Sequence, residues 1–254
     1  MDKRKQNRLV PAVALCLALT GASACLPANA AEQDPFEPVN RVVFKFNDFL
    51  DSWLLRPTAV FYHAVLPGFA ENGVRNFVGN LGEIRNTVHN GLQGKAVGAL
   101  QSAERFLINS TVGIGGLFDV ASKLGIPLQR EDLGQTLGVW GLSSGAYLVL
   151  PLVGPSSVRD GLGAVVDPFL SPLRQLSIDN GPRIGIAALA GVQTRADLLA
   201  AESLLMGDAY SQYRQVYLSK RAYDVQDGIL DGDDFLDQGE DFSSDDGNFV
   251  DEGF

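Results

Sequence analysis

The sequence is poor in the residues that form disulfides and metal centres, with two cysteines and two histidines among 254 residues. Cys16 lies in an apolar N-terminal stretch that we expect to be removed, so no disulfide pair would remain. His63 and His89 are too few for a histidine-rich metal site, and we expect His89 to lie at a surface or an interface. The sequence therefore predicts neither a metal site nor another cofactor.

The patterns that mark enzymes and nucleotide-binding proteins are incomplete. Gly141-Leu142-Ser143-Ser144-Gly145 fits the G-x-S-x-G pattern of a serine hydrolase. That motif needs a strand before the serine, a helix after it and a histidine later in the chain, whereas both histidines precede Ser143. No segment has the Walker spacing or a strand–GxGxxG–helix unit. We therefore expect a protein that is not an enzyme.

Positive charge and long apolar runs are also scarce. Beyond the N-terminus no run reaches the roughly 18 to 20 apolar residues that a membrane-spanning helix needs. The formal charge of −10 disfavours nucleic acid as a partner. From Asp224 onward there are about a dozen acidic residues and no Lys or Arg, so we expect residues 224–254 to form a disordered acidic tail. Asp231-Gly232-Asp233-Asp234 begins like a calcium loop, but the next residues, Phe235 and Leu236, break that pattern.

The N-terminus has the features of an export signal. Basic residues occur at Lys3, Arg4, Lys5 and Arg8, and residues 9–24 are almost wholly apolar or small. We expect residues 1–30 to act as a signal peptide with one of two cleavage sites. Cleavage before Cys25 would leave a lipidated cysteine at the mature N-terminus, and cleavage after Ala30 would follow the small-residue sequence Ala28-Asn29-Ala30.

Between the signal and the tail, apolar residues recur at spacings of three and four, which predicts amphipathic helices. One helix is expected over residues 39–54 and should end at Pro57. Other helices are expected over residues 74–92, 97–108, 157–166, 183–190 and 195–220. The glycine-rich segment 133–158 predicts extended chain or loop. The predicted fold class is all-α with short extended segments, in one domain over residues 31–223.

The fourteen phenylalanines of the chain and its two-faced helices allow two interpretations. The apolar stripes could form an ordinary core, as in a soluble periplasmic lipid-binding or scaffold protein. They could instead contact lipid. Export and a mean hydropathy of +0.06 favour lipid contact.

Several runs of residues together resemble a known family. They are Asp34-Pro35-Phe36-Glu37-Pro38-Val39-Asn40-Arg41, Phe44-Lys45-Phe46-Asn47, Leu55-Arg56-Pro57, Val74-Arg75-Asn76-Phe77-Val78-Gly79-Asn80-Leu81, Arg105-Phe106-Leu107-Ile108-Asn109-Ser110-Thr111, Gly113-Ile114-Gly115-Gly116-Leu117-Phe118-Asp119-Val120-Ala121 and Tyr147-Leu148-Val149-Leu150-Pro151-Leu152-Val153-Gly154-Pro155-Ser156-Ser157-Val158-Arg159-Asp160. Over about residues 34–223 the chain resembles the MlaA (VacJ) family of outer-membrane phospholipid-transport lipoproteins.

This resemblance implies a ring-like arrangement of amphipathic helices around a central channel, lying in the periplasmic leaflet of the outer membrane. Such a protein removes mislocalised phospholipid from the outer leaflet and passes it to a periplasmic lipid carrier of the MlaC type, which maintains lipid asymmetry. A trimeric outer-membrane porin is the other implied partner.

The resemblance also points to residues near the channel. By position it assigns gating to Phe46 and Asn47, and it places the segment from Tyr147 to Pro151 close to the channel. Gly138 and Gly141 would let the backbone approach closely there and absorb hinge-like changes.

Overall fold

The computed structural model describes residues 34–175, 179–204 and 207–228. The predicted signal peptide, Cys25 and residues 229–254 of the predicted tail lie outside the described residues. The first residues of that tail, 224–228, are described, and they complete the last helix and a turn.

The N-terminal arm is one helical path that changes its winding midway. α4 (Glu37–Leu50) runs into a π-helical turn, η1 (Asp51–Leu55), and continues as α5 (Arg56–Val65). The prediction that Pro57 ends the helix is wrong, because Pro57 lies in the first turn of α5. A proline is tolerated at a helix start, where the amide that it lacks needs no partner. The π turn before it re-registers the backbone hydrogen bonds without ending the helical path.

A pair of long helices follows, and both were predicted from their apolar spacing. α6 (Gly68–Leu92) packs against α7 (Ala96–Thr111). After α7 the glycine run forms turns, with φ of 69° at Gly115 and 94° at Gly116, which are left-handed conformations that glycine adopts readily. The short helix α8 (Val120–Lys123) comes next and is capped by the Asp119 side chain.

The glycine-rich segment contains both a helix and a hairpin. β1 (Tyr147–Leu150) and β2 (Gly154–Ser157) pair antiparallel, as the prediction of extended chain allows. That prediction is wrong for α9 (Leu133–Val139), which begins where the Asp132 carboxylate accepts a hydrogen bond of 2.8 Å from the Gln135 amide. The cap supplies the start signal for a helix whose own residues include two glycines.

The remaining elements are α10 (Val158–Val166), η2 (Asp167–Leu170), α11 (Pro172–Gln175), α12 (Asn180–Asp197), η3 (Leu199–Leu204) and α13 (Ala209–Val225). Helices near 157–166 and 183–190 are therefore confirmed. The predicted single helix over residues 195–220 is wrong, because α12 ends at Asp197 and α13 starts only at Ala209. Gly207, with a φ of 88°, makes part of this break.

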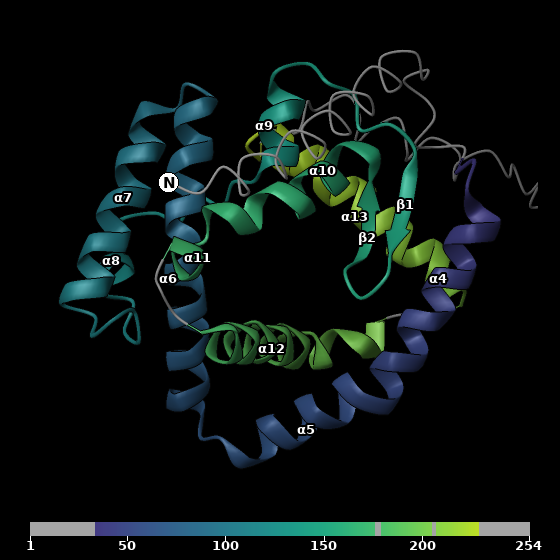
Figure 1. Cartoon of the computed structure of the whole chain (residues 1–254), viewed down its shortest axis with the longest axis horizontal. Coiled ribbons are helices and arrows are strands. Elements are labelled where there is room, and N and C mark those ends of the chain that lie inside the picture. The colour runs from purple at the N-terminus through teal and green to yellow at the C-terminus, as the bar shows by residue number, and fades with distance from the viewer. Residues whose placement is uncertain (1–33, 176–178, 205–206, 229–254) are drawn as a thin grey trace, which may run out of the picture.

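Figure 1 shows the elements arranged as a ring. α4 and α5 form one edge, and α6 lies on the side opposite α4. α12 crosses the lower part and packs against both α5 and α6, while the hairpin packs against α4. The predicted fold class, a mostly helical protein with a ring-like arrangement and short extended segments, is confirmed.

The distribution of side chains is the reverse of an ordinary soluble core. Among the described residues, eighteen polar or charged residues are buried and only eight apolar ones. Six of the eight buried apolar residues form two small clusters, one around Ala59 and Tyr62 and one around Tyr147 and Tyr210. Buried polar groups need hydrogen-bond partners, so the interior of this fold is specified by polar contacts.

Large apolar side chains are instead exposed along α4, η1 and α5, and at Phe36 directly before α4. We call this set the apolar belt: Phe36, Val39, Val42, Phe46, Phe49, Trp53, Leu54, Val60, Phe61 and Val65. Trp53 is 76% exposed and Phe61 is 67% exposed. Contiguous exposed apolar surface of this kind marks a site that contacts a membrane or another protein.

Candidate functional site

A cavity of about 580 Å³ lies between α6, α10, α12, α13 and the β-hairpin. This volume falls in the usual range for sites that bind small molecules. Its apolar lining comes mainly from α6 and α12, and its charged lining mainly from the segments around α9, α10 and α13. The apolar residues include Val78, Leu81, Val153, Leu173, Ile186 and Ala190, and the charged residues are Arg85, Asp132, Asp160, Asp167 and Arg221. The cavity is thus two-sided in chemistry.

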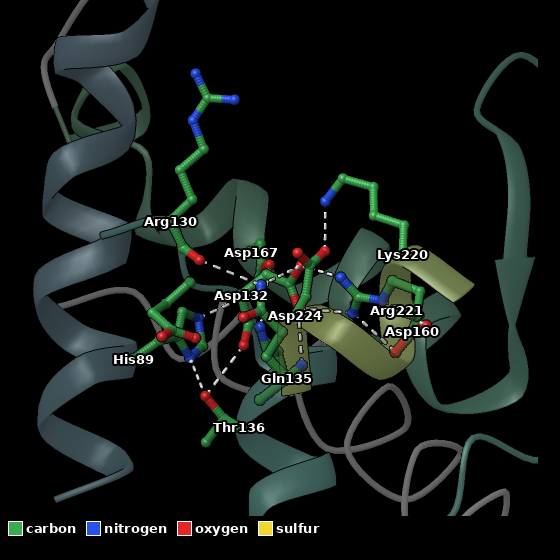
Figure 2. A network of polar contacts seen from close by, with 12 residues as sticks. His89, Arg130, Asp132, Gln135, Thr136, Asp160, Asp167, Lys220, Arg221 and Asp224 are labelled. Atoms are coloured by element: carbon green, nitrogen blue, oxygen red, sulfur yellow. Dashed lines mark hydrogen bonds and ion pairs between the residues drawn. The ribbon is translucent and has the colours of Figure 1, made fainter. Parts of the chain in front are cut away.

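Arg221 on α13 organises most of the charged side. Its guanidinium donates to both oxygens of Asp132 at 2.8 and 3.0 Å and to Asp160 at 2.9 Å (Figure 2). Burial alone would raise the pKa of Asp132, but the hydrogen bonds and charge of Arg221 outweigh it and hold the pKa below its ordinary value. Burial, together with the charge of Asp160, raises the pKa of Tyr217, whose hydroxyl donates to that carboxylate.

His89 closes the network on the α6 side. Its Nδ1 lies 3.0 Å from the Thr136 hydroxyl and its Nε2 lies 3.2 Å from the Asp167 carboxylate (Figure 2). The expectation that His89 lies at a surface is wrong, because only 1% of it is exposed. Its two polar partners allow an imidazole to be buried here. Within the described residues no three side chains of His, Cys, Asp or Glu gather as metal ligands would.

Two asparagines of α4, two helical turns apart, bind the hairpin through hydrogen bonds. Asn40 donates to the Tyr147 carbonyl at 3.0 Å and accepts from the Val149 amide at 2.9 Å. Asn47 donates to the Leu150 carbonyl at 2.9 Å and accepts from the Leu152 amide at 2.9 Å. Each side chain therefore satisfies an otherwise unpaired edge of β1 as a neighbouring strand would.

A second cavity, of about 460 Å³, lies on the other side of the hairpin. Asn47 lines it together with Phe44, Arg195 and Tyr213. Pro155 lines both cavities, so the start of β2 lies at the boundary between them. The side chain of Asn47 thus holds the end of the hairpin that separates the two spaces.

The structure places the residues assigned by resemblance in different surroundings. Phe46, half exposed, belongs to the apolar belt and points away from the cavities, whereas the next residue, Asn47, faces the hairpin. Tyr147 is fully buried between Tyr210 and Tyr217, with ring centroids 6.1 and 5.8 Å away, and it lines neither cavity. Burial raises the pKa of Tyr147 to about 12.

Gly138 and Gly141, which were expected to allow close backbone approach and hinge-like changes, serve local geometry. A Cβ atom on Gly138 would come within 2.8 Å of the Arg159 guanidinium and 2.9 Å of Val225, so α9 can pack this closely only with glycine there. Gly141 has a φ of 90° in the turn after α9, in open space. Neither glycine lines the cavities.

Ser143 does not occupy a nucleophile elbow. It is exposed in the loop that follows helix α9 and precedes strand β1, which reverses the strand–serine–helix order of that motif.

Several residues of the site have no signal in the sequence. The pairing of Asp132 with Arg221 spans 89 positions, and single-sequence periodicity carries no information on such contacts. Asn40 and Asp160 belong to the runs that resemble the family. Only the fold shows that Asn40 binds the backbone of the hairpin and that Asp160 binds Arg221.

None of the described helices is long and apolar enough to cross a bilayer.

Comparison with known proteins identifies strong similarities. The family model for the MlaA lipoprotein matches residues 32–224. The intermembrane phospholipid transport system lipoprotein MlaA of Escherichia coli is 34% identical over 226 residues, covering 85% of this chain and 89% of that protein. The protein of the same name from Haemophilus influenzae is 32% identical over 242 residues, covering 89% and 93%.

The fold has a solved counterpart. A chain from a structural study of the maintenance of bacterial outer membrane lipid asymmetry superposes with a TM-score of 0.67 at 33% identity. The match covers 76% of this chain and 98% of that one.

Proposed function

The chain belongs to the MlaA lipoprotein family, and we propose that it moves phospholipid out of the outer membrane through the space that its ring of helices surrounds. In this role it removes mislocalised phospholipid from the outer leaflet and maintains the lipid asymmetry of that membrane. The observation that carries the proposal is the inverted distribution of side chains, with apolar groups outside and charged groups around a two-sided cavity.

The apolar belt supports a location within the periplasmic leaflet. Each large apolar side chain gains about 1.5–3 kcal/mol when it is transferred fully from water to an apolar phase. The belt contains ten such side chains on one continuous helical path. Because that path is amphipathic and no described helix spans a bilayer, it would lie in the plane of one leaflet.

The cavity suits a molecule with a polar head and apolar tails. Val78 and Leu81 on α6 and Ile186 on α12 offer an apolar wall, and Arg221 with its carboxylates offers a polar one. A closed apolar pocket would exclude the headgroup, and a wholly polar pore would exclude the acyl chains. A passage with one apolar wall and one polar wall would contact the acyl chains and the headgroup of a lipid at the same time.

The hairpin end is the element that we assign to gating. Asn47 holds Leu150 and Leu152 at the end of the hairpin whose Pro155 lines both cavities, and Phe46 would fix the same turn of α4 to the apolar surroundings. Release of the hairpin would join the two spaces. Tyr147, Gly138 and Gly141 would act indirectly by setting the position of the hairpin and of α9.

The proposed partners follow from the same role. A lipid that leaves the ring on the periplasmic side needs a soluble carrier that covers its acyl chains, and a periplasmic carrier of the MlaC type would serve. A trimeric porin would fix the ring in the membrane. Lipidation of Cys25 would add a second attachment, and an intact-mass measurement of the mature N-terminus distinguishes it from cleavage after Ala30.

Deletion of the gene tests the proposal. The deletion strain is expected to expose phospholipid in the outer leaflet, measured with an impermeant amine-reactive label and by sensitivity to detergent and chelator. Complementation with the wild-type chain should restore the barrier. Unchanged surface labelling in the deletion strain would contradict the transport role.

Fractionation separates this function from that of a soluble periplasmic binding protein. We expect to recover the mature chain in the outer-membrane fraction, and we expect its release to require detergent. Recovery in the soluble periplasm without detergent would favour the soluble protein. Ser143→Ala is expected to complement fully, whereas a lipid hydrolase that used Ser143 would lose all activity.

A further inference from the structure

Arg85 is a charged side chain of the cavity that the fold leaves without a partner. It lies on α6, lines the larger cavity and is only partly exposed. Within the described part of the chain it makes no hydrogen bond or ion pair, and its Nε is buried and unsatisfied. A buried guanidinium nitrogen without an acceptor is unfavourable, so the Arg85 side chain would gain from contact with an anionic group of a ligand.

The other charges of the cavity are already matched. Arg221 is held by Asp132 and Asp160, and Asp167 accepts hydrogen bonds from the Leu133 amide and lies 3.2 Å from His89. The Nε, Nη1 and Nη2 atoms of Arg221 already donate to Asp132 and Asp160, so Arg221 is not free to bind an incoming anion. Arg85 is therefore the cavity guanidinium that remains available.

The neighbours of Arg85 are apolar. Val78 and Leu81 precede it by seven and four residues, so they lie on the same face of α6. Leu173, Ile186 and Ala190 line the same cavity from α11 and α12. A ligand bound at Arg85 would thus carry an anionic group beside a substantial apolar part.

We infer that Arg85 binds the phosphate of a phospholipid while its acyl chains lie along Val78, Leu81 and Ile186. The inference rests on the proposed function and adds a headgroup-binding residue to it. The planar guanidinium can donate two parallel hydrogen bonds to phosphate oxygens, a geometry that a lysine ammonium does not reproduce.

Native mass spectrometry of the mature chain released from detergent tests this inference. The probes are phosphatidylglycerol, diacylglycerol with the same acyl chains, and inorganic phosphate. Arg85→Gln is expected to weaken phosphatidylglycerol binding about tenfold to a hundredfold, because a hydrogen-bonded charge pair is lost. Binding of diacylglycerol, which has no phosphate, should not change. Arg130→Gln is the matched control, since Arg130 is exposed outside this cavity.

Three results would overturn the inference. Arg85→Gln could bind phosphatidylglycerol as the wild-type chain does. It could lose diacylglycerol to the same degree, which would make Arg85 a structural residue only. Inorganic phosphate could bind the wild-type chain as tightly as the lipid does, which would identify a site for free phosphate.

Arg85→Lys covers the case in which Arg85→Gln does not fold. It keeps the charge but loses the two-pronged geometry, and we expect phosphatidylglycerol binding several-fold weaker than wild type; equality with wild type would refute the inference. The proposed function fails separately: it fails if the wild-type chain binds no phospholipid and its deletion leaves the cell surface unchanged. If wild type and Arg85→Gln bind lipid equally, only the role of Arg85 fails.

Discussion

Replacing Asn47 with alanine would remove both hydrogen bonds that fasten the end of the hairpin to α4. The Leu152 amide and the Leu150 carbonyl would each lose a partner that lies 2.9 Å away. A neutral hydrogen bond contributes about 0.5–1.5 kcal/mol, so the pair amounts to about 1–3 kcal/mol. Because Asn40 still holds the other end of β1, the loss should open the hairpin end locally and leave the ring folded.

Hydrogen–deuterium exchange of the chain in lipid nanodiscs measures this opening directly. A loss of about 1–3 kcal/mol corresponds to about fivefold to 150-fold faster exchange at the Leu152 amide. Under the gating proposal the same variant also changes the rate at which the complemented deletion strain clears surface phospholipid. Asn76→Ala is the control, because Asn76 donates to the Leu117 carbonyl, far from the hairpin.

Unchanged exchange at Leu152 in Asn47→Ala would show that the two hydrogen bonds do not hold the hairpin. Faster exchange with unchanged lipid clearance would show that the two hydrogen bonds hold the hairpin, and it would contradict the proposal that the hairpin is a gate. Global unfolding would show that Asn47 supports the whole ring. The control should leave both measurements at the wild-type values.

Three further predictions concern stability and membrane binding. Arg221→Gln leaves the Asp132 carboxylate without its counter-charge and removes one of the two guanidinium partners of Asp160, the other being Arg159. It is expected to lower the free energy of unfolding by about 3–5 kcal/mol, as denaturant titration in detergent would measure; a loss below about 1 kcal/mol would contradict the network. Burial alone would raise the pKa of Asp119. Hydrogen bonds from Ser122, Asn109 and Arg105 outweigh burial and lower the pKa to about 2, against 3.8 ordinarily. Its contribution is complete above the ordinary value and is lost as the pH falls toward 2, so thermal melts should show a steeper acid loss for wild type than for Asp119→Asn. Trp53→Glu in η1 places a charge in the apolar belt and should weaken vesicle binding about tenfold in flotation assays, whereas Lys45→Glu in the preceding α4 should change it less.

The helices could be predicted from apolar spacing, but the direction of their faces could not. α6 and α7 lie where the apolar spacing predicts helices, yet the apolar Leu92 and Leu107 of these helices are exposed, while the charged Glu83 and Arg105 are buried. Apolar periodicity predicts that a helix has an apolar and a polar face, but it does not predict whether water, lipid or protein contacts the apolar face. Export and hydropathy supplied the argument for lipid.

The errors have local physical causes. The expectation that Pro57 ends the helix follows from proline's missing amide donor, but the preceding π turn puts Pro57 in the first turn of α5, where proline is tolerated. α9 was missed because its start depends on the Asp132 cap and its packing on the close approach at Gly138. Neither contact leaves a periodic apolar pattern. Arg85 lies on the same face of α6 as Val78 and Leu81, and its lack of a partner within the described residues is a property of the fold that apolar spacing does not report.

If the belt lies among acyl chains, as proposed, the hydrophobic effect adds little to the cohesion of the ring, because lipid is as apolar as the side chains it would contact. The ring then depends on polar contacts between segments far apart in the chain. Arg105 binds Glu83 at 2.8 Å, Arg221 binds Asp132 across 89 positions, and Arg195 binds Asp51 at 2.7 Å across 144. Such partly or fully buried pairs are weakly screened by salt but are lost when the carboxylates are protonated. The ring should therefore persist at high ionic strength and come apart in acid, in the opposite order to a fold held by surface ion pairs.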